Sequence, residues 1–264
     1  MLTHFPSRGA RVRIPLPALM SLLSLVIAIY EKILKREVLN SQIGVNHILL
    51  VLDESDLLPD GRVSMSISDN AATKGLKRLK LFIKWCDSLR IDVISIYISI
   101  IREGVGRKLL DAVHRHLKEA VIAALSDVDV GASIAVYSSD SYASARFING
   151  SGRGGGGVKR INVSIGMGGR SELTKAVREI AKHVESGEIE PDEIDEKMIE
   201  ANLIFKSEPD LVIRSGATRL TDFLIWQSVY SEFYFTDVNW QNFRKIDLFR
   251  AVRDFQLRER RFGR

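Results

Sequence analysis

The segment "NHILLVLDESDLLPDGR", residues 46–62, changes character abruptly at its centre. Its branched apolar run, residues 47–53, is typical of a short buried β-strand and ends at Asp53. Two further carboxylates follow at once, at Glu54 and Asp56. Asp53 is therefore either a metal-binding residue at the end of a strand or the polar start of a loop, and these residues alone leave both interpretations open.

Similar apolar runs recur along the chain, and segments with the apolar spacing of helices separate them. The runs show no polar alternation, which favours strands that are buried on both faces. The sequence therefore predicts a single α/β domain with a mostly parallel central sheet flanked by helices. The predicted strands are residues 47–53, 91–99, 132–139, 159–167 and 210–215, and the predicted helices are 71–89, 106–125, 170–187, 190–203 and 245–263.

Four polar or small residues fall where predicted strands end, namely Asp53, Ser99, Gly168 and Arg214. In open parallel sheets, ligands bind beyond the carboxyl ends of the strands. The sequence therefore places a candidate binding site at that edge of the predicted sheet.

Composition narrows the classes of partner. The chain has 264 residues, is 45% hydrophobic and carries a net charge of +5, spread as singlets and short clusters. That charge is compatible with phosphates or a membrane face, and it lacks the long basic tract that favours nucleic acid. Cys86 is the only cysteine, which excludes an intrachain disulfide and a cysteine metal cage and favours a reducing, cytoplasmic setting.

Residues 14–30 form an apolar segment with arginines before it and lysines after it. Spanning a bilayer takes roughly 20 apolar residues, and Pro15 and Pro17 shorten the helical part. Three interpretations stay open: a helix on or dipping into a membrane, a single span, or a helix docked on the domain or a partner chain. We therefore divide the chain into a membrane-associating or docking helix, 1–40, and a domain, 41–264.

The segment "DLVIRSGATRLTDFLIWQSVYSEFYFTDVNWQNF", residues 210–243, carries the clearest chemistry. Arg214 and Arg219 follow an apolar run, with Thr221 close by, and such a set can hold a diphosphate through charge-assisted hydrogen bonds or can form surface ion pairs. Glu232 lies among aromatic residues, where a carboxylate is costly unless it is paired or bound to a metal.

This segment, together with "GMGGRSELTKAVREIA" (166–181) and "RDFQLRERRFG" (253–263), closely resembles the cis-prenyltransferases, the undecaprenyl- and dehydrodolichyl-diphosphate synthase family. The resemblance implies a Mg²⁺-dependent transferase that adds isopentenyl diphosphate units to an allylic diphosphate. It also implies a dimer whose parallel sheet borders an elongated apolar tunnel for the growing chain.

The resemblance also assigns expected roles to individual residues. Asp53 aligns with the aspartate that holds the allylic diphosphate and the metal, and Glu232 with a glutamate implicated in Mg²⁺ binding. The isopentenyl diphosphate set corresponds to Arg214, Arg219 and Thr221. The terminal Arg261 and Gly263 resemble an Arg-x-Gly motif that contacts the diphosphate in the neighbouring subunit.

The chain departs from the family pattern around its own allylic site. "ESDLLPDGR" stands where Gly-Asn-x-x-Arg-Trp is expected, and Ala71 and Ala72 replace a glycine and a histidine. Extra carboxylates repel a diphosphate by about 1–4 kcal/mol for each close pair near a surface. Of the family's Gly-His-x-x-Gly motif only Gly75 is kept.

The retained parts have a common theme. Residues 223–237 resemble the family's subunit interface, and the tail keeps the cross-subunit motif. The sequence thus favours a catalytically degenerate partner that completes the site of an active homologue and is anchored at the cytoplasmic membrane face through residues 14–36. Two alternatives are a self-sufficient homodimeric synthase that uses Asp53 and Glu232, and a lipid-phosphate-binding protein.

Overall fold

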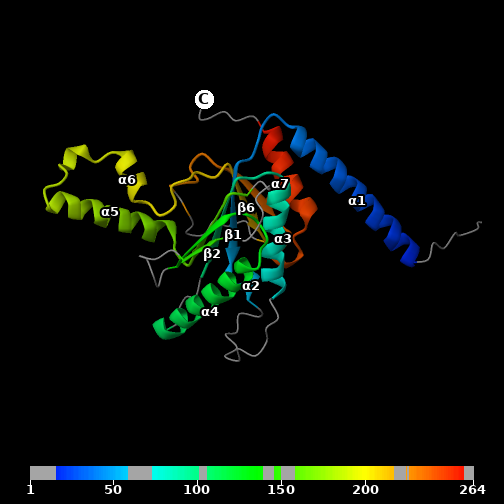
Figure 1. The fold of residues 1–264 in the computed structure, drawn as a ribbon, viewed down its shortest axis with the longest axis horizontal. Helices are drawn as coiled ribbons and strands as arrows, with labels where there is room; N and C mark the ends of the chain where they lie inside the picture. Colours follow the sequence, from blue (N-terminus) through cyan, green and yellow to red (C-terminus); the bar gives the residue numbers. More distant parts are fainter. Residues whose placement is uncertain are drawn as a thin grey trace, which may run out of the picture.

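A computed structural model gives the arrangement of most of the chain (Figure 1). The residues it describes are 16–58, 73–100, 106–138, 146–149, 158–216, 224 and 226–258.

A seven-stranded sheet with the order β4-β3-β5-β2-β1-β6-β7 organises the domain. Every neighbouring pair is parallel except β3 and β4, so the predicted mostly parallel α/β sheet is confirmed. The strands are β1 (His47–Asp53), β2 (Val93–Ser99), β3 (Ser133–Ser138), β4 (Arg146–Asn149), β5 (Arg160–Ile165), β6 (Leu211–Ser215) and β7 (Glu232–Thr236).

Helices follow most of the strands, as the alternating pattern predicts. Figure 1 shows α3 and α7 close to the sheet, whereas α5 and α6 project from it. The helices are α1 (Leu16–Asn40), α2 (Glu54–Leu57), α3 (Lys74–Ser88), α4 (Arg107–Ser126), α5 (Gly169–Glu185), α6 (Glu196–Asn202) and α7 (Lys245–Leu257), with short 3₁₀ turns η2 (Pro191–Glu193) and η3 (Trp240–Asn242).

The larger apolar core lies between one face of the sheet and α3, α4 and α7. Phe82 and Trp240 are fully buried there and meet edge to face, with their ring centroids 5.7 Å apart. The indole Nε1–H of Trp240 donates to the carbonyl of Gly75 at 3.0 Å. A buried indole with its polar atom satisfied fixes η3 to the start of α3 and thereby sets where α7 begins.

The opposite face of the sheet is more polar than expected. The register brings Ser95, Asn162 and Leu49 side by side on it, and Ser164 lies two residues further along β5. The prediction of strands without polar alternation is therefore wrong for this face. These polar side chains are buried, and the pair from His47 Nε2 to Ser95 Oγ, at 2.8 Å, shows how one of them is satisfied.

Three segments differ from the predicted elements. A four-residue helix, α2, stands directly after β1 where the sequence indicates a loop. The mixed helix and strand signals of residues 221–237 resolve, in the described part, into the edge strand β7. The predicted helix 245–263 ends at Leu257, because Arg258 is extended at φ −80° and ψ 136°.

The second half of α1 packs on α7. Leu34 and Val38 are buried, and the guanidinium of Arg250 lies 5.5 Å from the ring centroid of Tyr30. The Gln256 amide donates to the carbonyl of Val38 at 3.1 Å. Because Tyr30 meets Arg250 and Val38 meets Gln256, α1 and α7 run in the same direction.

The first half of α1 extends away from the domain (Figure 1). Large apolar side chains are exposed there over more than half of the helix circumference, since successive residues are offset by about 100°. Within the described residues, no helix combines the length and apolarity needed to cross a bilayer. The exposed apolar residues of this half are Leu23, Leu25, Val26, Ile27 and Ile29.

Glu172 is a buried carboxylate near the start of α5 that holds the chain leading into β6. It accepts hydrogen bonds from the backbone N–H groups of Ile204 and Phe205, at 2.9 and 3.0 Å, and from the amide of Gln227 at 3.2 Å. Burial raises the pKa of Glu172, although these hydrogen bonds act in the opposite direction.

Glu172→Gln is expected to change how stability depends on pH. A folded-state pKa above the ordinary value of 4.5 gives stability that is complete below pH 4.5 and is lost as the pH rises through the folded-state pKa. The free energy of unfolding of the wild type, measured with urea, should therefore fall relative to Glu172→Gln as the pH rises above 4.5. A difference between the two proteins that stays constant or grows with pH would contradict this.

Candidate functional site

An ion pair between Asp53 and Arg214 dominates the carboxyl edge of the sheet. Val51 of β1 pairs with Arg214 of β6. Asp53 therefore lies two residues beyond the level of Arg214, with its side chain on the same face of the sheet. The Arg214 Nη2 donates to the Asp53 Oδ2 at 2.6 Å. The arginine side chain is 3% exposed and that of the aspartate is 34% exposed, so the guanidinium depends on this carboxylate for its counter-charge.

Hydrogen-bonding capacity remains at this pair. Among the described residues, Arg214 Nε and Nη1 and Asp53 Oδ1 are buried without a hydrogen-bond partner. Buried polar atoms of this kind are normally satisfied, and an arginine fork with two open donors is suited to a phosphate oxygen. The open donors support the prediction that Arg214 can bind a diphosphate, although the diphosphate would compete with Asp53 for the guanidinium.

The turn after Asp53 is capped by its own side chains. The Asp53 backbone N–H donates to Asp56 Oδ2 at 2.9 Å, at the start of α2. Burial raises the pKa of Asp56, and the charge of Asp53 raises it further, whereas Arg214 lowers it. A carboxylate therefore occupies a backbone donor at the helix start, where an anion would otherwise bind.

Among the described residues, the turn that follows β1 is rich in carboxylates. Asp53, Glu54 and Asp56 are consecutive or nearly so, and Arg214 forms an ion pair with Asp53 and lowers the pKa of Asp56. Each close contact between a carboxylate and a phosphate costs about 1–4 kcal/mol near a surface. Binding a diphosphate here requires Arg214 to leave Asp53 or to serve both groups.

The acidic turn is held in place by α3. A Cβ atom added to Gly75 would lie 1.9 Å from the carbonyl oxygen of Asp56, so the two helices touch through backbone. Thr73 caps α3 by accepting from the Leu76 N–H at 3.2 Å, and its hydroxyl donates to the carbonyl of Leu57. The retained glycine therefore keeps the carboxylates in place.

Glu232 lies at the other end of the sheet from Asp53. It pairs with Leu211 at the start of β6, whereas Asp53 is level with residue 216. The step from residue 211 to residue 216 corresponds to about 17 Å at roughly 3.3 Å per residue. Two carboxylates of one chain so far apart cannot share an ion.

The donor set of one chain therefore does not fit a two-carboxylate magnesium site. The described residues contain no group of three or more His, Cys, Asp or Glu side chains arranged to hold a metal. Asp53 offers only Oδ1, since Oδ2 accepts from Arg214. The carboxylate of Glu232 accepts from Arg258 Nη1 at 3.0 Å.

The other predicted positions divide into two groups. Ser99 pairs with Asp53 across β1 and β2, and Gly168 precedes α5 just after β5, so both lie at the carboxyl edge as predicted. Arg219, Thr221, Arg261 and Gly263 lie outside the described residues. Sequence reasoning left ion pairing of Arg214 and of Glu232 open, but it did not identify their partners, Asp53 and Arg258. The signal for pairing was an arginine after an apolar run and an acid among aromatic residues.

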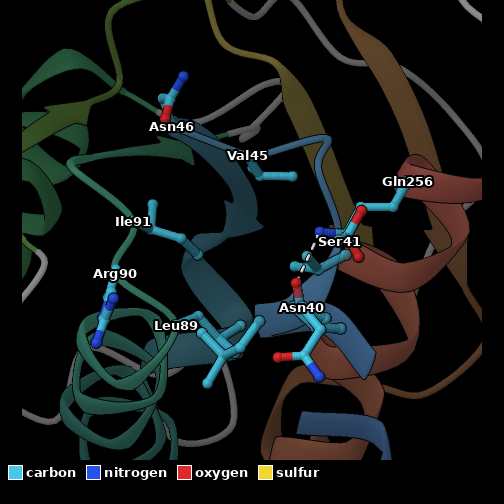
Figure 2. Close-up of a pocket in the computed structure, with 12 residues that line it drawn as sticks. Asn40, Ser41, Val45, Asn46, Leu89, Arg90, Ile91 and Gln256 are labelled. Atoms are coloured by element: carbon cyan, nitrogen blue, oxygen red, sulfur yellow. Dashed lines mark hydrogen bonds between the residues drawn. The ribbon is translucent and has the colours of Figure 1, made fainter. Parts of the chain in front are cut away.

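An open pocket of about 450 Å³ lies at the opposite, amino edge of the sheet (Figure 2). Val45 precedes β1 there, and Ile91 precedes β2. Arg90, at φ 60°, forms part of the rim and Gln256 of α7 borders it. This pocket is therefore separate from the phosphate site that the sequence predicts.

A double-mutant cycle tests the ion pair. Asp53→Ala should lower the free energy of unfolding by on the order of 3 kcal/mol, because it strands the buried guanidinium of Arg214. Arg214→Ala should cost less through electrostatics, because the carboxylate of Asp53 is partly exposed to water. The double variant should recover at least about 1 kcal/mol of the summed loss, as judged by urea unfolding. The exposed pair of Lys182 and Glu179, 2.9 Å apart, is the matched control, with an expected coupling below about 0.5 kcal/mol. Equal coupling energies would show that the Asp53–Arg214 pair contributes no more to stability than the exposed pair does.

Comparisons with known proteins identify the family of this chain. A protein-family model described as "Putative undecaprenyl diphosphate synthase" matches residues 62–263. The chain is 52% identical over 110 residues to a tritrans,polycis-undecaprenyl-diphosphate synthase of Methanocaldococcus jannaschii, and this match covers 39% of each chain. It is 46% identical over 110 residues to an isoprenyl transferase of Streptococcus agalactiae, 39% of this chain and 44% of the relative. These matches thus span less than half the length of either relative.

Solved structures share the fold. Lavandulyl diphosphate synthase from Lavandula x intermedia superposes with a TM-score of 0.62 and 24% identity, covering 83% of this chain and 98% of that one. A probable undecaprenyl diphosphate synthase from Campylobacter jejuni gives 0.58 and 20%, covering 84% of this chain and all of the other. Because the family model extends over most of the sequence, from before α3 to the C-terminal tail, the chain belongs to the undecaprenyl diphosphate synthase family of cis-prenyltransferases.

Proposed function

We propose that this chain is a catalytically degenerate subunit in polyprenyl diphosphate synthesis, which completes the active site of a catalytically competent homologue. The observation that carries the proposal is the buried pair of Asp53 and Arg214. The arginine expected to bind isopentenyl diphosphate neutralises the aspartate expected to bind the metal. The Mg²⁺-dependent chemistry is then performed at the partner's site.

The packing of the core supports the same proposal. A tunnel for a prenyl chain must pass through apolar side chains, and it is wider than a water molecule. Side chains that line such a tunnel would have surface accessible to water. Side chains from α3 and α4 that face the sheet instead have 0% accessible surface, namely Leu79, Phe82, Ile83, Leu117 and Val121.

The edge of the sheet supports a dimer. β7 is an edge strand, and exposed edges tend to pair or to be covered. Phe233 and Phe235 stack on it with their ring centroids 6.2 Å apart. Phe235, Tyr230 and Val229 are all exposed. Residues 223–237 are those that resemble the family's subunit interface, so we infer that this face contacts the homologue.

A self-sufficient homodimeric synthase is the second candidate. The unpartnered atoms Arg214 Nε, Arg214 Nη1 and Asp53 Oδ1 favour it, because they could hold a diphosphate without breaking the ion pair. In that case Glu232 could reach an ion only in the neighbouring subunit.

Activity assays distinguish the two candidates. The purified chain alone should incorporate no labelled isopentenyl diphosphate into lipid, and a family member with an intact Gly-Asn-x-x-Arg-Trp loop should gain activity when the chain is added. Robust incorporation by the chain alone would support the homodimeric synthase. Binding of polyprenyl phosphate without any effect on synthesis would support a lipid-phosphate-binding protein.

Two substitutions sharpen the assay. Arg261→Ala should lower the activity of the mixture at least about tenfold, since loss of a charged contact to a diphosphate is worth roughly 1.4 kcal/mol or more. Asp53→Ala should leave the activity of a correctly assembled mixture nearly unchanged. If Asp53→Ala abolishes turnover while the dimer persists, the site of this chain is catalytic.

We further propose that the helix 1–40 binds a membrane surface and that residues 41–264 form the transferase-like domain. The first half of α1, residues 16–29, is about 21 Å long at roughly 1.5 Å per residue, shorter than a bilayer core of about 30 Å. Lys32 and Arg36 follow this half, and cations there suit an anionic leaflet. Lipid can surround an apolar helix on all sides, whereas a protein partner covers one face.

Flotation with vesicles tests the membrane proposal. Leu25→Glu combined with Ile29→Glu should reduce co-flotation with vesicles of phosphatidylcholine and phosphatidylserine at least about tenfold, because each places a charge in the apolar layer. Val177→Glu, at an exposed apolar residue of α5, is the control and should float like the wild type. Equal flotation of all three proteins would reject insertion of α1.

A further inference from the structure

The pocket at the amino edge of the sheet is built from parts of the chain that are far apart in the sequence (Figure 2). The end of α1 and the turn after it form one wall, the turn between α3 and β2 forms another, and α7 borders the pocket. Its volume of about 450 Å³ lies within the range of roughly 300–1,000 Å³ that is typical of small-molecule sites. The length of β1, about 20 Å at roughly 3.3 Å per residue, separates it from Asp53.

Hydrogen bonds fix the walls of this pocket in place. The Gln256 amide donates to the carbonyls of Val38 and Ile43, at 3.1 and 2.8 Å, and so joins α7 to the turn after α1. Within that turn, the Ile43 N–H donates to the hydroxyl of Ser41 at 3.2 Å. The pocket is therefore formed before a ligand binds, which spares the ligand the entropic cost of ordering its walls.

Arg90 stands on the rim of the pocket in an unusual backbone conformation. Its φ of 60° is the only positive φ of a non-glycine residue in the described part of the chain. The Arg90 N–H donates to the carbonyl of Asp87 at 3.0 Å, and the Ile91 N–H donates to that of Cys86 at 3.2 Å, which is the Schellman pattern at a helix C-terminus. Glycine is the usual residue at this position, because a Cβ atom is unfavourable there. An arginine here is strained, and strained residues cluster at functional sites.

This arginine also supplies the charge of the pocket. Among the described residues that line it, Arg90 is the one charged side chain. Arg90 is exposed, and it forms no ion pair with a residue of the described ranges. The carboxylate of Asp210 contacts the same edge, but it accepts from the backbone N–H groups of Asn46 and His47, at 2.8 and 3.0 Å, and does not line the pocket. A guanidinium with open donors is suited to a carboxylate or a phosphate.

The remaining lining is part polar and part apolar. The side-chain amides of Asn40 and Asn46 form no hydrogen bond within the described residues, so both can donate to an anion. Val45, Leu89 and Ile91 are buried members of the larger core, and Figure 2 shows them around the hollow. A cation at the rim of an apolar wall favours a ligand that is itself charged at one end and apolar at the other.

We propose that this pocket binds a small amphiphilic anion, with its phosphate or carboxylate group at Arg90 and its hydrocarbon part against Val45, Leu89 and Ile91. Inorganic phosphate lacks the apolar part and a neutral alcohol lacks the charge, so neither meets both halves of the pocket. A bound ligand contacts the end of α1, the turn before β2 and α7 together, and therefore holds α1 more firmly on the domain. The site belongs to the single chain and does not depend on a partner subunit.

Isothermal titration of the purified full chain tests the binding. Farnesyl phosphate and decanoate, each below the concentration at which it forms micelles, represent the two kinds of head group. At least one of them should bind with one molecule per chain, whereas inorganic phosphate and farnesol should bind at least about tenfold more weakly. Tighter binding of farnesyl phosphate assigns the site to phosphate esters, and tighter binding of decanoate assigns it to carboxylates. Absence of saturable binding by both, or equal binding of farnesol, would overturn the inference.

Substitution of the rim arginine separates ligand contact from folding. Arg90→Gly should weaken binding at least about tenfold, yet its Tm without ligand should be no lower than that of the wild type, because glycine adopts a φ of 60° without strain. Arg90→Lys keeps the charge and should weaken binding less. Arg115→Gln, at an exposed arginine of α4 outside the pocket, is the control and should bind like the wild type. An unchanged affinity in Arg90→Gly would contradict the assignment.

The exposed apolar half of α1 is the other surface that can take up hydrocarbon, so the binding must be located. Leu25→Glu combined with Ile29→Glu should bind the same ligand like the wild type. In ¹⁵N spectra the side-chain amide signals of Asn40 and Asn46 should shift on titration, whereas that of Asn202 on α6 should not. If the α1 double variant loses binding while Arg90→Gly retains it, the ligand lies on α1 and the pocket is not its site.

Discussion

The buried ion pair between Arg214 and Asp53 is the constraint on which the site depends. Parallel pairing of β1 with β6 sets both side chains on one face at the carboxyl edge of the sheet. Arg214 is buried, so it cannot lose its counter-charge without a penalty of several kcal/mol. Asp56 adds a second carboxylate beside it, fixed by the close contact of α2 with Gly75. A dianionic ligand must therefore either displace this interaction or share Arg214 with Asp53.

Elsewhere in the molecule, the tightly packed core contrasts with the surface of β7 that we infer to face a neighbour. The core beneath the sheet is filled by side chains without accessible surface, including Phe82 and Leu117. By contrast, β7 is an edge strand that pairs with β6 alone among the described strands, and it carries an exposed phenylalanine, Phe235. Its first residue, Glu232, accepts a hydrogen bond from Arg258 at the end of α7. These features favour the proposed partner role over a site that houses a growing lipid.

Much of the fold could be predicted from the sequence, because its strands are mostly apolar runs between amphipathic segments. The strand of residues 47–53 is a clear example. β7 was ambiguous, since its aromatic residues suit helix or strand equally and only pairing with β6 decides. The ion pair of Asp53 and Arg214 could not be predicted, because 161 residues separate the partners and the strand order is a tertiary property. The same holds for Glu232, whose aromatic surroundings suggested a metal whereas its partner is Arg258.

Isothermal titration of the isolated chain with isopentenyl diphosphate in the presence of Mg²⁺ tests the central claim most directly. If the Arg214–Asp53 pair closes the site, the wild-type chain should show no saturable binding at concentrations up to about 1 mM, a free energy weaker than about −4 kcal/mol. Saturable binding of one ligand per chain, lost on Arg214→Ala, would show that the site of this chain is open and would contradict the account.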